Sequence, residues 1–167
     1  MKPSLNLRSS ISQVLFLFLC LFLIVSTANA TSCKSIRGSL EETIVPPPDC
    51  TSPVGLCTAG NIWGHVKGQF RFTASAIINS GDTSITNVVF VTGNTVLSNI
   101  SMGNKRGTIT TKSAAAFRTS GDGELNDLQI ITGGTGSFAG VSGSLQIFGN
   151  FVNGSGISSV EGTICLP

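Results

Sequence analysis

The chain has 167 residues, with ten Lys and Arg against eight Asp and Glu, and only 11% of its residues are charged. The charges are scattered along the sequence, so it lacks the basic patch with which nucleic-acid-binding proteins hold phosphates. We therefore predict that nucleic acid is not a partner.

The N-terminal segment is typical of a secretory signal peptide. Lys2 and Arg8 precede an unbroken apolar run, VLFLFLCLFLIV at 14–25, and Ala28-Asn29-Ala30 follows it. The alternative is an uncleaved membrane anchor, but this run is shorter than the roughly 20 residues that a spanning helix needs. The Ala-x-Ala ending favours cleavage after Ala30.

Cleavage defines the organisation that we expect for the rest of the chain. Residues 1–30 form the signal peptide, and residues 31–167 form a single domain without a membrane span. The protein is then secreted into the extracellular space, or is periplasmic if its source is a Gram-negative bacterium. The mean hydropathy of +0.35 is inflated by the signal segment and does not indicate a membrane protein.

Four cysteines remain after cleavage: Cys33, Cys50, Cys57 and Cys165. In an exported chain this number predicts two disulfides, for which three pairings are possible. Zinc binding is one alternative, but Cys50 and Cys57 do not have the Cys-x₂₋₄-Cys spacing of zinc sites. Lipidation of Cys33, as in bacterial lipoproteins, is another, but it would leave an odd cysteine.

Apolar and polar residues alternate with a period of two through most of the predicted domain, and no segment has convincing helical periodicity. In IWGHVKGQFRFTASAII at 62–78, the even positions are apolar or small and most odd positions are polar. At 88–91 the sequence VVFV is apolar on both faces, so we expect that strand to be covered on both sides. Gly121-Asp122-Gly123 and Asn153-Gly154 are turn sequences. Seven or eight antiparallel strands are predicted, at 33–44, 62–78, 84–97, 106–118, 125–132, 143–152 and 157–166.

One long linker, at 45–60, interrupts the strands. It contains four prolines and both middle cysteines, and proline lacks the N–H donor that a sheet ladder requires. We hypothesise that a Cys50–Cys57 disulfide staples this loop. The remaining pair, Cys33 and Cys165, would then join the first and last strands, which closes the sheet into a barrel without exposed edges. The predicted fold class is therefore all-β, a closed antiparallel β-barrel of about eight strands.

The segment TGGTGSFAGVSG at 132–143 is unusually rich in glycine. A phosphate-binding loop is one reading, but there is no Gly-Lys-Ser/Thr ending, and the following residues alternate like a strand rather than opening a helix. The reading that we favour is a turn or bulge, in which Gly133, Gly134 and Gly136 permit positive φ, and Gly140 and Gly143 allow close backbone approach. In that reading a phenylalanine fills an apolar space. The residues of this motif are Gly133, Gly134, Gly136, Phe138, Gly140 and Gly143.

This glycine-rich motif resembles a stretch of plant allene oxide cyclases and dirigent proteins and of their secreted bacterial relatives. The resemblance is specific over 131–143 and extends through strand count and order over roughly 60–167. It implies an eight-stranded antiparallel barrel, often trimeric, with a ligand cavity inside. No catalytic position of those families matches this chain, which has no tyrosine, so the resemblance assigns no catalytic residue.

Candidate ligand-binding residues come from the basic and aromatic side chains. His65 is the only histidine, and Lys67 and Arg71 follow it at even spacing on the same predicted face. Such a cationic set suits a carboxylate ligand or acid–base chemistry, although a solvated strand face has the same pattern. Trp63 shares that face and suits a ligand platform or a subunit contact. Arg118 is a further candidate polar group.

Other polar clusters have simpler interpretations. Asp122, Glu124 and Asp127 gather near a turn, but they lack the ligand count of a calcium loop, and we interpret them as solvated. We predict no metal site and no cofactor. Asn99 and Asn153 begin glycosylation sequons, which matter only if the source is eukaryotic.

The function that we expect is that of a secreted barrel that binds a small apolar ligand or steers a cyclisation or coupling by holding a flexible molecule in one shape. Whether it is an enzyme stays open; an isomerase or cyclase without a cofactor would fit. A homo-oligomer is also expected. The alternative is a non-catalytic exported structural or surface protein without a ligand cavity. Interior packing discriminates between them, since no ligand fits if the interior is filled by Phe70, Phe72, Phe90, Phe117 and Phe151.

Overall fold

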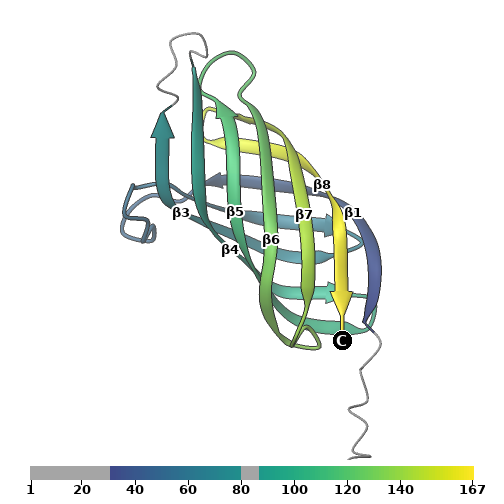
Figure 1. Ribbon diagram of the computed structural model, residues 1–167. Coiled ribbons are helices and arrows are strands. Elements are labelled where there is room, and N and C mark those ends of the chain that lie inside the picture. The colour runs from purple at the N-terminus through teal and green to yellow at the C-terminus, as the bar shows by residue number, and fades with distance from the viewer. Residues whose placement is uncertain (1–30, 80–86) are drawn as a thin grey trace, which may run out of the picture. The chain divides into compact units, whose positions relative to one another are not determined.

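The computed structural model describes residues 31–79 and 87–167, and every structural statement below refers to these residues. The predicted signal peptide lies outside them. The described chain forms eight strands and no helix, and it therefore contains no helix able to cross a membrane. The strands, shown in Figure 1, are β1 (Ser32–Ile44), β2 (Cys57–Gly64), β3 (Lys67–Asn79), β4 (Val88–Met102), β5 (Lys105–Arg118), β6 (Glu124–Gly136), β7 (Ser142–Val152) and β8 (Ser155–Leu166).

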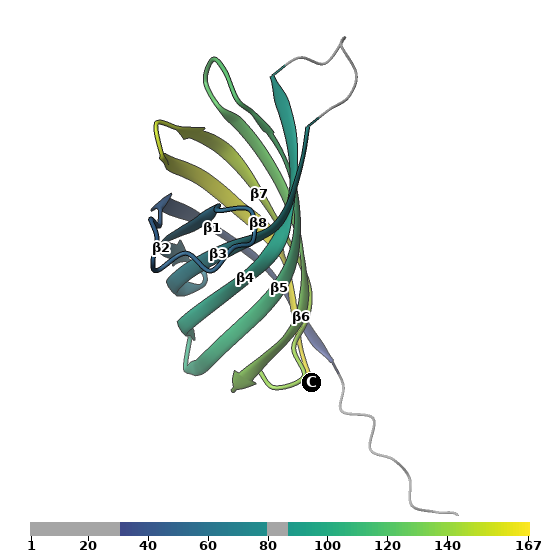
Figure 2. The same ribbon diagram turned by 90° about the vertical axis from the view of Figure 1, so that its left-hand side faces the viewer.

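The eight strands close into a barrel in sequence order, and each neighbouring pair is antiparallel. Closure is made by β1 and β8, which pair from Ser32↔Leu166 to Thr43↔Ser155. Figures 1 and 2 show these two strands side by side. Because each strand has a neighbour on both sides, no edge is left unpaired. The predicted fold class is confirmed.

Both hypothesised disulfides are present, Cys33–Cys165 and Cys50–Cys57. Cys33 and Cys165 are direct register partners on β1 and β8, with their Cα atoms 3.9 Å apart. The first bond therefore joins the two strands that close the barrel. The second staples the β1–β2 loop to the start of β2.

The segment predicted as one strand at 62–78 is two strands joined by a tight turn at His65 and Val66. Gly64 enters this turn at φ 126°, a conformation that favours glycine. Ile62, Val66 and Phe70 are all buried, because both strands of the hairpin face the same interior. The alternation of apolar and polar residues therefore continues across the turn, so the period of the sequence does not reveal the turn.

Two other boundaries differ from the sequence prediction. The loop predicted at 45–60 ends at Leu56, and the four residues from Cys57 to Gly60 belong to β2. No proline lies between Pro53 and the end of the predicted loop at Gly60, so these residues keep the N–H donors that a ladder requires. The strand predicted to begin at 84 begins in the described chain at Val88, and residues 84–86 lie outside the described residues.

The VVFV segment is not covered on both sides as expected. Val91 is buried, but Phe90 points outward and is 44% exposed. A barrel wall has only one interior face, so alternate apolar residues of one strand must point to the outside.

The glycine-rich segment forms the end of β6, a turn at 137–140 and the start of β7. Phe138 is fully buried in this turn, which confirms that it fills an apolar space. Gly136 and Gly143 have positive φ, but Gly133 and Gly134 do not, and that part of the prediction is wrong. They are extended residues of β6.

The roles of these glycines follow from what surrounds them. A Cβ atom on Gly134 would lie 2.5 Å from the carbonyl oxygen of Thr108, so this glycine permits close backbone approach. The β5–β6 irregularity lies between the pairs Thr110↔Gly133 and Thr111↔Ile131.

The two ends of the barrel differ in how tightly side chains pack in the interior. At one end lie the β2–β3, β4–β5 and β6–β7 turns, and here buried apolar side chains pack into a core. It includes Val66, Ile100, Ile109, Phe138, Val141 and Leu166. The opposite end carries the β1–β2, β5–β6 and β7–β8 connections and contains the cavity described below.

Candidate functional site

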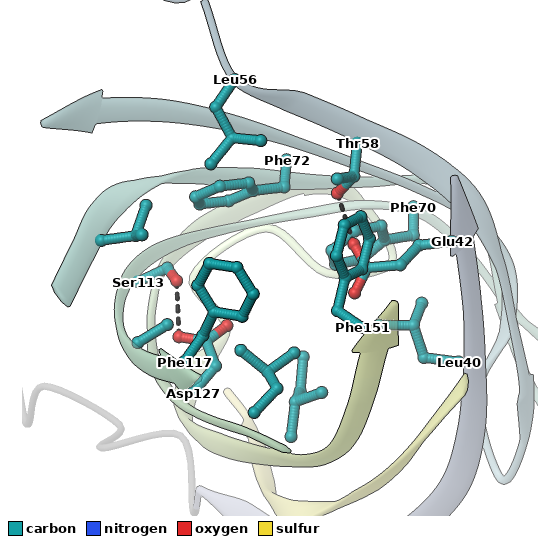
Figure 3. Close-up of a pocket in the computed structure, with 14 residues that line it drawn as sticks. Leu40, Glu42, Leu56, Thr58, Phe70, Phe72, Ser113, Phe117, Asp127 and Phe151 are labelled. Atoms are coloured by element: carbon teal, nitrogen blue, oxygen red, sulfur yellow. Dashed lines mark hydrogen bonds between the residues drawn. The ribbon is translucent and has the colours of Figure 1, made fainter. Parts of the chain in front are cut away.

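A cavity of about 80 Å³ lies inside the barrel, toward the end with the stapled β1–β2 loop (Figure 3). Since roughly 10–15 Å³ holds one water molecule, it has room for a few waters or for the head of a small ligand. Its lining is mostly aromatic and aliphatic: Leu40, Leu56, Phe70, Phe72, Val91, Ala115, Phe117, Leu125, Ile147 and Phe151, with the polar residues Glu42, Thr58, Ser113 and Asp127.

Glu42 enters the cavity from β1 and is only 6% exposed. Its register partners on β2 and β8 are Gly60 and Gly156. A Cβ atom on Gly156 would lie 3.4 Å from Glu42 Cγ, so this glycine leaves room for the Glu42 side chain. The Thr58 hydroxyl donates a hydrogen bond to Oε2. Burial raises the pKa of Glu42 above its ordinary value of 4.5; the Thr58 hydrogen bond opposes this rise, and the charge of Asp127 adds to it.

Asp127 enters from β6 and is 9% exposed. Ser113 Oγ donates to its Oδ1 at 2.5 Å, and Gln129 Nε2 donates to its Oδ2 at 2.7 Å. Thr111 in turn donates to Gln129 Oε1 at 2.9 Å, which fixes the orientation of the amide. Burial raises the pKa of Asp127, and the hydrogen bonds from Ser113, Gln129 and the Ala114 backbone oppose the rise.

The two carboxyl groups have different environments. Figure 3 shows them on opposite sides of the cavity, with the rings of Phe72, Phe117 and Phe151 around them. Both oxygens of Asp127 accept hydrogen bonds, whereas only Oε2 of Glu42 has a described side-chain donor. Hydrogen bonds to the ionised form favour ionisation, so they oppose the effect of burial more strongly at Asp127 than at Glu42. Such a pair can donate and accept protons at a bound ligand.

Four of the phenylalanines expected in the interior line this cavity, but the candidate ligand-binding residues His65, Arg71, Arg118 and Trp63 do not. His65, Arg71 and Trp63 are exposed on the outer face. His65 Nδ1 accepts a 3.1 Å hydrogen bond from the Arg37 N–H. Arg71 donates to the carbonyl oxygen of Asp49 and so ties the stapled loop to β3. The structure thus gives Arg71 a structural contact, and it does not bring these side chains together with the two buried carboxyl groups.

Arg118, Asp122 and Glu124 do not line the cavity either. Arg118 ends β5 and lies 3.8 Å from Asp122 and 3.9 Å from Glu124, all three exposed. Asp127, in contrast, points into the barrel, because it is on the inner face of β6. The interpretation of this cluster as a solvated turn is therefore wrong for Asp127. Within residues 31–79 and 87–167, no group of three or more His, Cys, Asp or Glu is arranged to hold a metal ion.

Both sequon asparagines are exposed and have positive φ, 52° at Asn99 and 53° at Asn153. Asn99 lies at the bulge of β4 and donates to Gln69 Oε1 at 2.9 Å. Asn153 and Gly154 form the predicted β7–β8 turn.

The outer face has an apolar hollow of its own across β4, β5, β6 and β7. Its exposed walls are Phe90, Leu128 and Phe148, and Ala114 and Ala116 form its floor. These outward positions lie between the inward ones of the same strands. The hollow is thus separated from the interior cavity by the barrel wall.

The sequence around Asp127 contains a signal of its inward position. In the β6 segment Asp127-Leu128-Gln129-Ile130, the polar residues face inward and the apolar ones face outward. This inverted alternation is unusual for a strand with one wet face. Glu42 had a weaker signal: it follows the buried Leu40 by two positions and so shares its inward face.

No protein-family model matches the chain, and no curated protein matches it.

Proposed function

We propose that this protein binds a small, mostly apolar ligand in the interior cavity and presents Glu42 and Asp127 to the ligand's polar group. The observation that carries the proposal is the burial of two ionisable side chains in a largely apolar cavity. Burying carboxyl groups costs stability. A barrel that served only as a stable module would gain from apolar side chains at both positions. Retaining two acids there favours a role in binding or chemistry.

The activity that we propose is control of a cyclisation or coupling, with no cofactor. The walls would hold a flexible molecule in one shape, and the two carboxyl groups would exchange protons with it. The resemblance of the glycine-rich segment to allene oxide cyclases and dirigent proteins supports this proposal, as does an eight-stranded closed barrel. The resemblance is an analogy of fold and motif, and fold alone does not assign function.

The alternative is an exported structural or surface protein. That alternative predicts an interior filled by five phenylalanines. Phe70, Phe72, Phe117 and Phe151 line the cavity and leave space between them, and Phe90 is outside. This packing favours the ligand-binding proposal.

The two disulfides are compatible with an oxidising compartment. Together with the N-terminal sequence they support our proposal that the protein is secreted or periplasmic. Intact-mass analysis of protein recovered from the native host tests it, with Thr31 expected as the first residue.

A pair of matched variants tests ligand binding. Ala115 lines the cavity, whereas its neighbour Ala114 is exposed on the outer face. We expect cyclopentane and 1-butanol to shift the amide resonances of cavity residues in the wild type, and A115L to abolish these shifts by filling the space. A114L makes the same chemical change outside and should leave binding intact. Equal binding by both variants, or no binding by the wild type, contradicts the proposal.

We also propose that the protein self-associates through the outer hollow around Phe90, Leu128 and Phe148. A closed barrel offers no free strand edge, so association requires a face, and large exposed apolar side chains favour contact with another protein surface. F148K is expected to weaken the oligomer in light-scattering measurements, whereas V96K, on another part of the outer face, is not. A wild-type monomer at high concentration contradicts this proposal.

A further inference from the structure

We infer that the ligand of the interior cavity carries a protonated amine, held between the carboxyl groups of Glu42 and Asp127. The inference rests on the proposed ligand-binding function and adds the chemical class of the ligand: an organic cation with a small apolar body. It follows from the charge, the hydrogen-bonding groups and the aromatic lining of the cavity.

The charge of the cavity lacks a counter-ion. Of its lining residues only Glu42 and Asp127 ionise, and no Lys, Arg or His is among them. The ion pairs found in the described part of the chain, such as Arg37–Glu161, lie on the exposed surface. Buried charges in proteins are normally paired. A cationic ligand supplies the missing charge, whereas an anionic ligand would be repelled by both groups.

The hydrogen-bonding groups in the interior also favour a ligand rich in donors. An ionised carboxylate offers about four acceptor positions, and Glu42 has one described side-chain donor, from Thr58. Two hydroxyl groups in the barrel interior have no described partner: Thr95 Oγ1 and Ser158 Oγ, in residues 0% and 3% exposed.

Thr95 and Ser158 are not themselves lining residues of the cavity, but each is paired with one that is. Thr95 is on the inner face of β4, where its register partner is Phe72, and Ser158 is on the inner face of β8, where its partner is Leu40. Phe72 and Leu40 both line the cavity. An ammonium group brings three N–H donors into this environment.

Aromatic rings complete the environment of a cation. Phe70, Phe72, Phe117 and Phe151 line the cavity, and the last two pack edge to face, with centroids 6.3 Å apart. The faces of aromatic rings attract ammonium groups, most strongly where water is excluded. The volume of about 80 Å³ limits the buried part of the ligand to a short chain or branched head. We therefore expect small alkylamines to fit.

Affinity for such a ligand should rise with pH. From β1 and β6, Glu42 and Asp127 face the site; the other strands that line it contribute no titratable side chain in the described residues. As pH rises these two groups ionise, while an alkylamine stays protonated through neutrality. A neutral alcohol of the same shape gains nothing from this ionisation.

The test compares n-butylamine, 1-butanol and butyrate by NMR titration of the full disulfide-bonded protein at pH 5 and pH 7.5. We expect n-butylamine to bind at least about tenfold more tightly than 1-butanol at pH 7.5, to weaken at pH 5, and butyrate not to bind. E42Q and D127N should each lower the amine affinity by about tenfold while leaving 1-butanol within about twofold. E41Q, which changes the exposed neighbour of Glu42, is the matched control.

The outcomes separate this inference from the proposed function. If 1-butanol binds as tightly as n-butylamine, or if E42Q and D127N leave the amine affinity unchanged, the cation assignment is overturned and the ligand-binding proposal stands. Preferential binding of butyrate overturns the assignment as well. If none of the three probes perturbs the cavity residues, the ligand-binding proposal and this inference both fail.

Discussion

Removing the Cys33–Cys165 disulfide should destabilise the protein far more than removing the Cys50–Cys57 disulfide. In the chain-entropy model, a disulfide stabilises by restricting the unfolded chain, and its effect grows with the length of the loop that it closes. The two bonds span 132 and 7 residues. The model gives about 5 kcal/mol for the first bond and about 2.4 kcal/mol for the second.

The native barrel should still form without the Cys33–Cys165 disulfide. β1 and β8 remain paired through the ladder that ends at Thr43↔Ser155, and the cysteine pair is close to one end of it. The effect of C33A/C165A therefore falls mainly on the unfolded state. Since small domains are stable by about 5–15 kcal/mol, the variant should fold with a small margin.

Urea unfolding followed by fluorescence or circular dichroism measures the difference. With an m-value of about 2 kcal/mol/M, C33A/C165A should lower the midpoint by about 2.5 M and C50A/C57A by about 1.2 M. Because Cys57 is fully buried, the Cys57→Ala single variant under reducing conditions controls for lost packing. A larger destabilisation by C50A/C57A than by C33A/C165A would refute the reasoning from loop length.

Three further predictions concern the core, a turn and the buried acids. Phe138→Ala should lower the free energy of unfolding by about 3–5 kcal/mol, measured in urea, because it opens a cavity in a fully buried site; a change below 1 kcal/mol would show that Phe138 does not fill the core. Gly143→Ala should destabilise the protein more than Gly55→Ala, since a Cβ atom at Gly143 (φ +130°) would lie 2.1 Å from a carbonyl oxygen of β8. At Gly55 (φ +74°) a Cβ atom meets nothing within 4 Å, so that substitution costs only about 1–2 kcal/mol of backbone strain. Equal melting temperatures of the two variants would contradict this. Burial raises the folded-state pKa of Glu42 and Asp127 above the unfolded values of 4.5 and 3.8, so the folded state binds more protons between these values and the raised ones. Their contribution to stability is therefore full below the unfolded pKa values and declines as pH rises through the folded pKa. E42Q and D127N should each flatten this decline when the free energy of unfolding is measured in urea from pH 4 to pH 8. An unchanged dependence of that free energy on pH would show that neither group titrates with a raised pKa.

Features that depend on local pattern could be predicted from the sequence. The β5–β6 and β7–β8 turns were marked by Gly121-Asp122-Gly123 and Asn153-Gly154, because their backbone conformations favour these residue types. The turn at His65 was missed because alternation continues through it. The outward direction of Phe90 was missed because an apolar run does not show which face is the interior.

The candidate site was the least predictable part. The residues chosen from the sequence were basic and aromatic, and His65, Arg71 and Trp63 are exposed. Asp127 was interpreted as part of a solvated turn, because acidic residues beside turns are usually exposed, and no motif marked Glu42. Their importance comes from burial, which residue type alone does not reveal.

By itself the sequence determined that the chain would form alternating strands, and it allowed the cysteine pairing that joins β1 to β8. These properties follow from period-two alternation and from residues at the two ends of the predicted domain, which can be read along the chain. Only the tertiary structure decided which face of each strand is the interior, and so placed Asp127 inside the barrel while Arg118, nearby in the sequence, remained outside. It also brought Glu42 of β1 and Asp127 of β6 into one cavity, because only closure of the barrel makes the inner faces of distant strands meet.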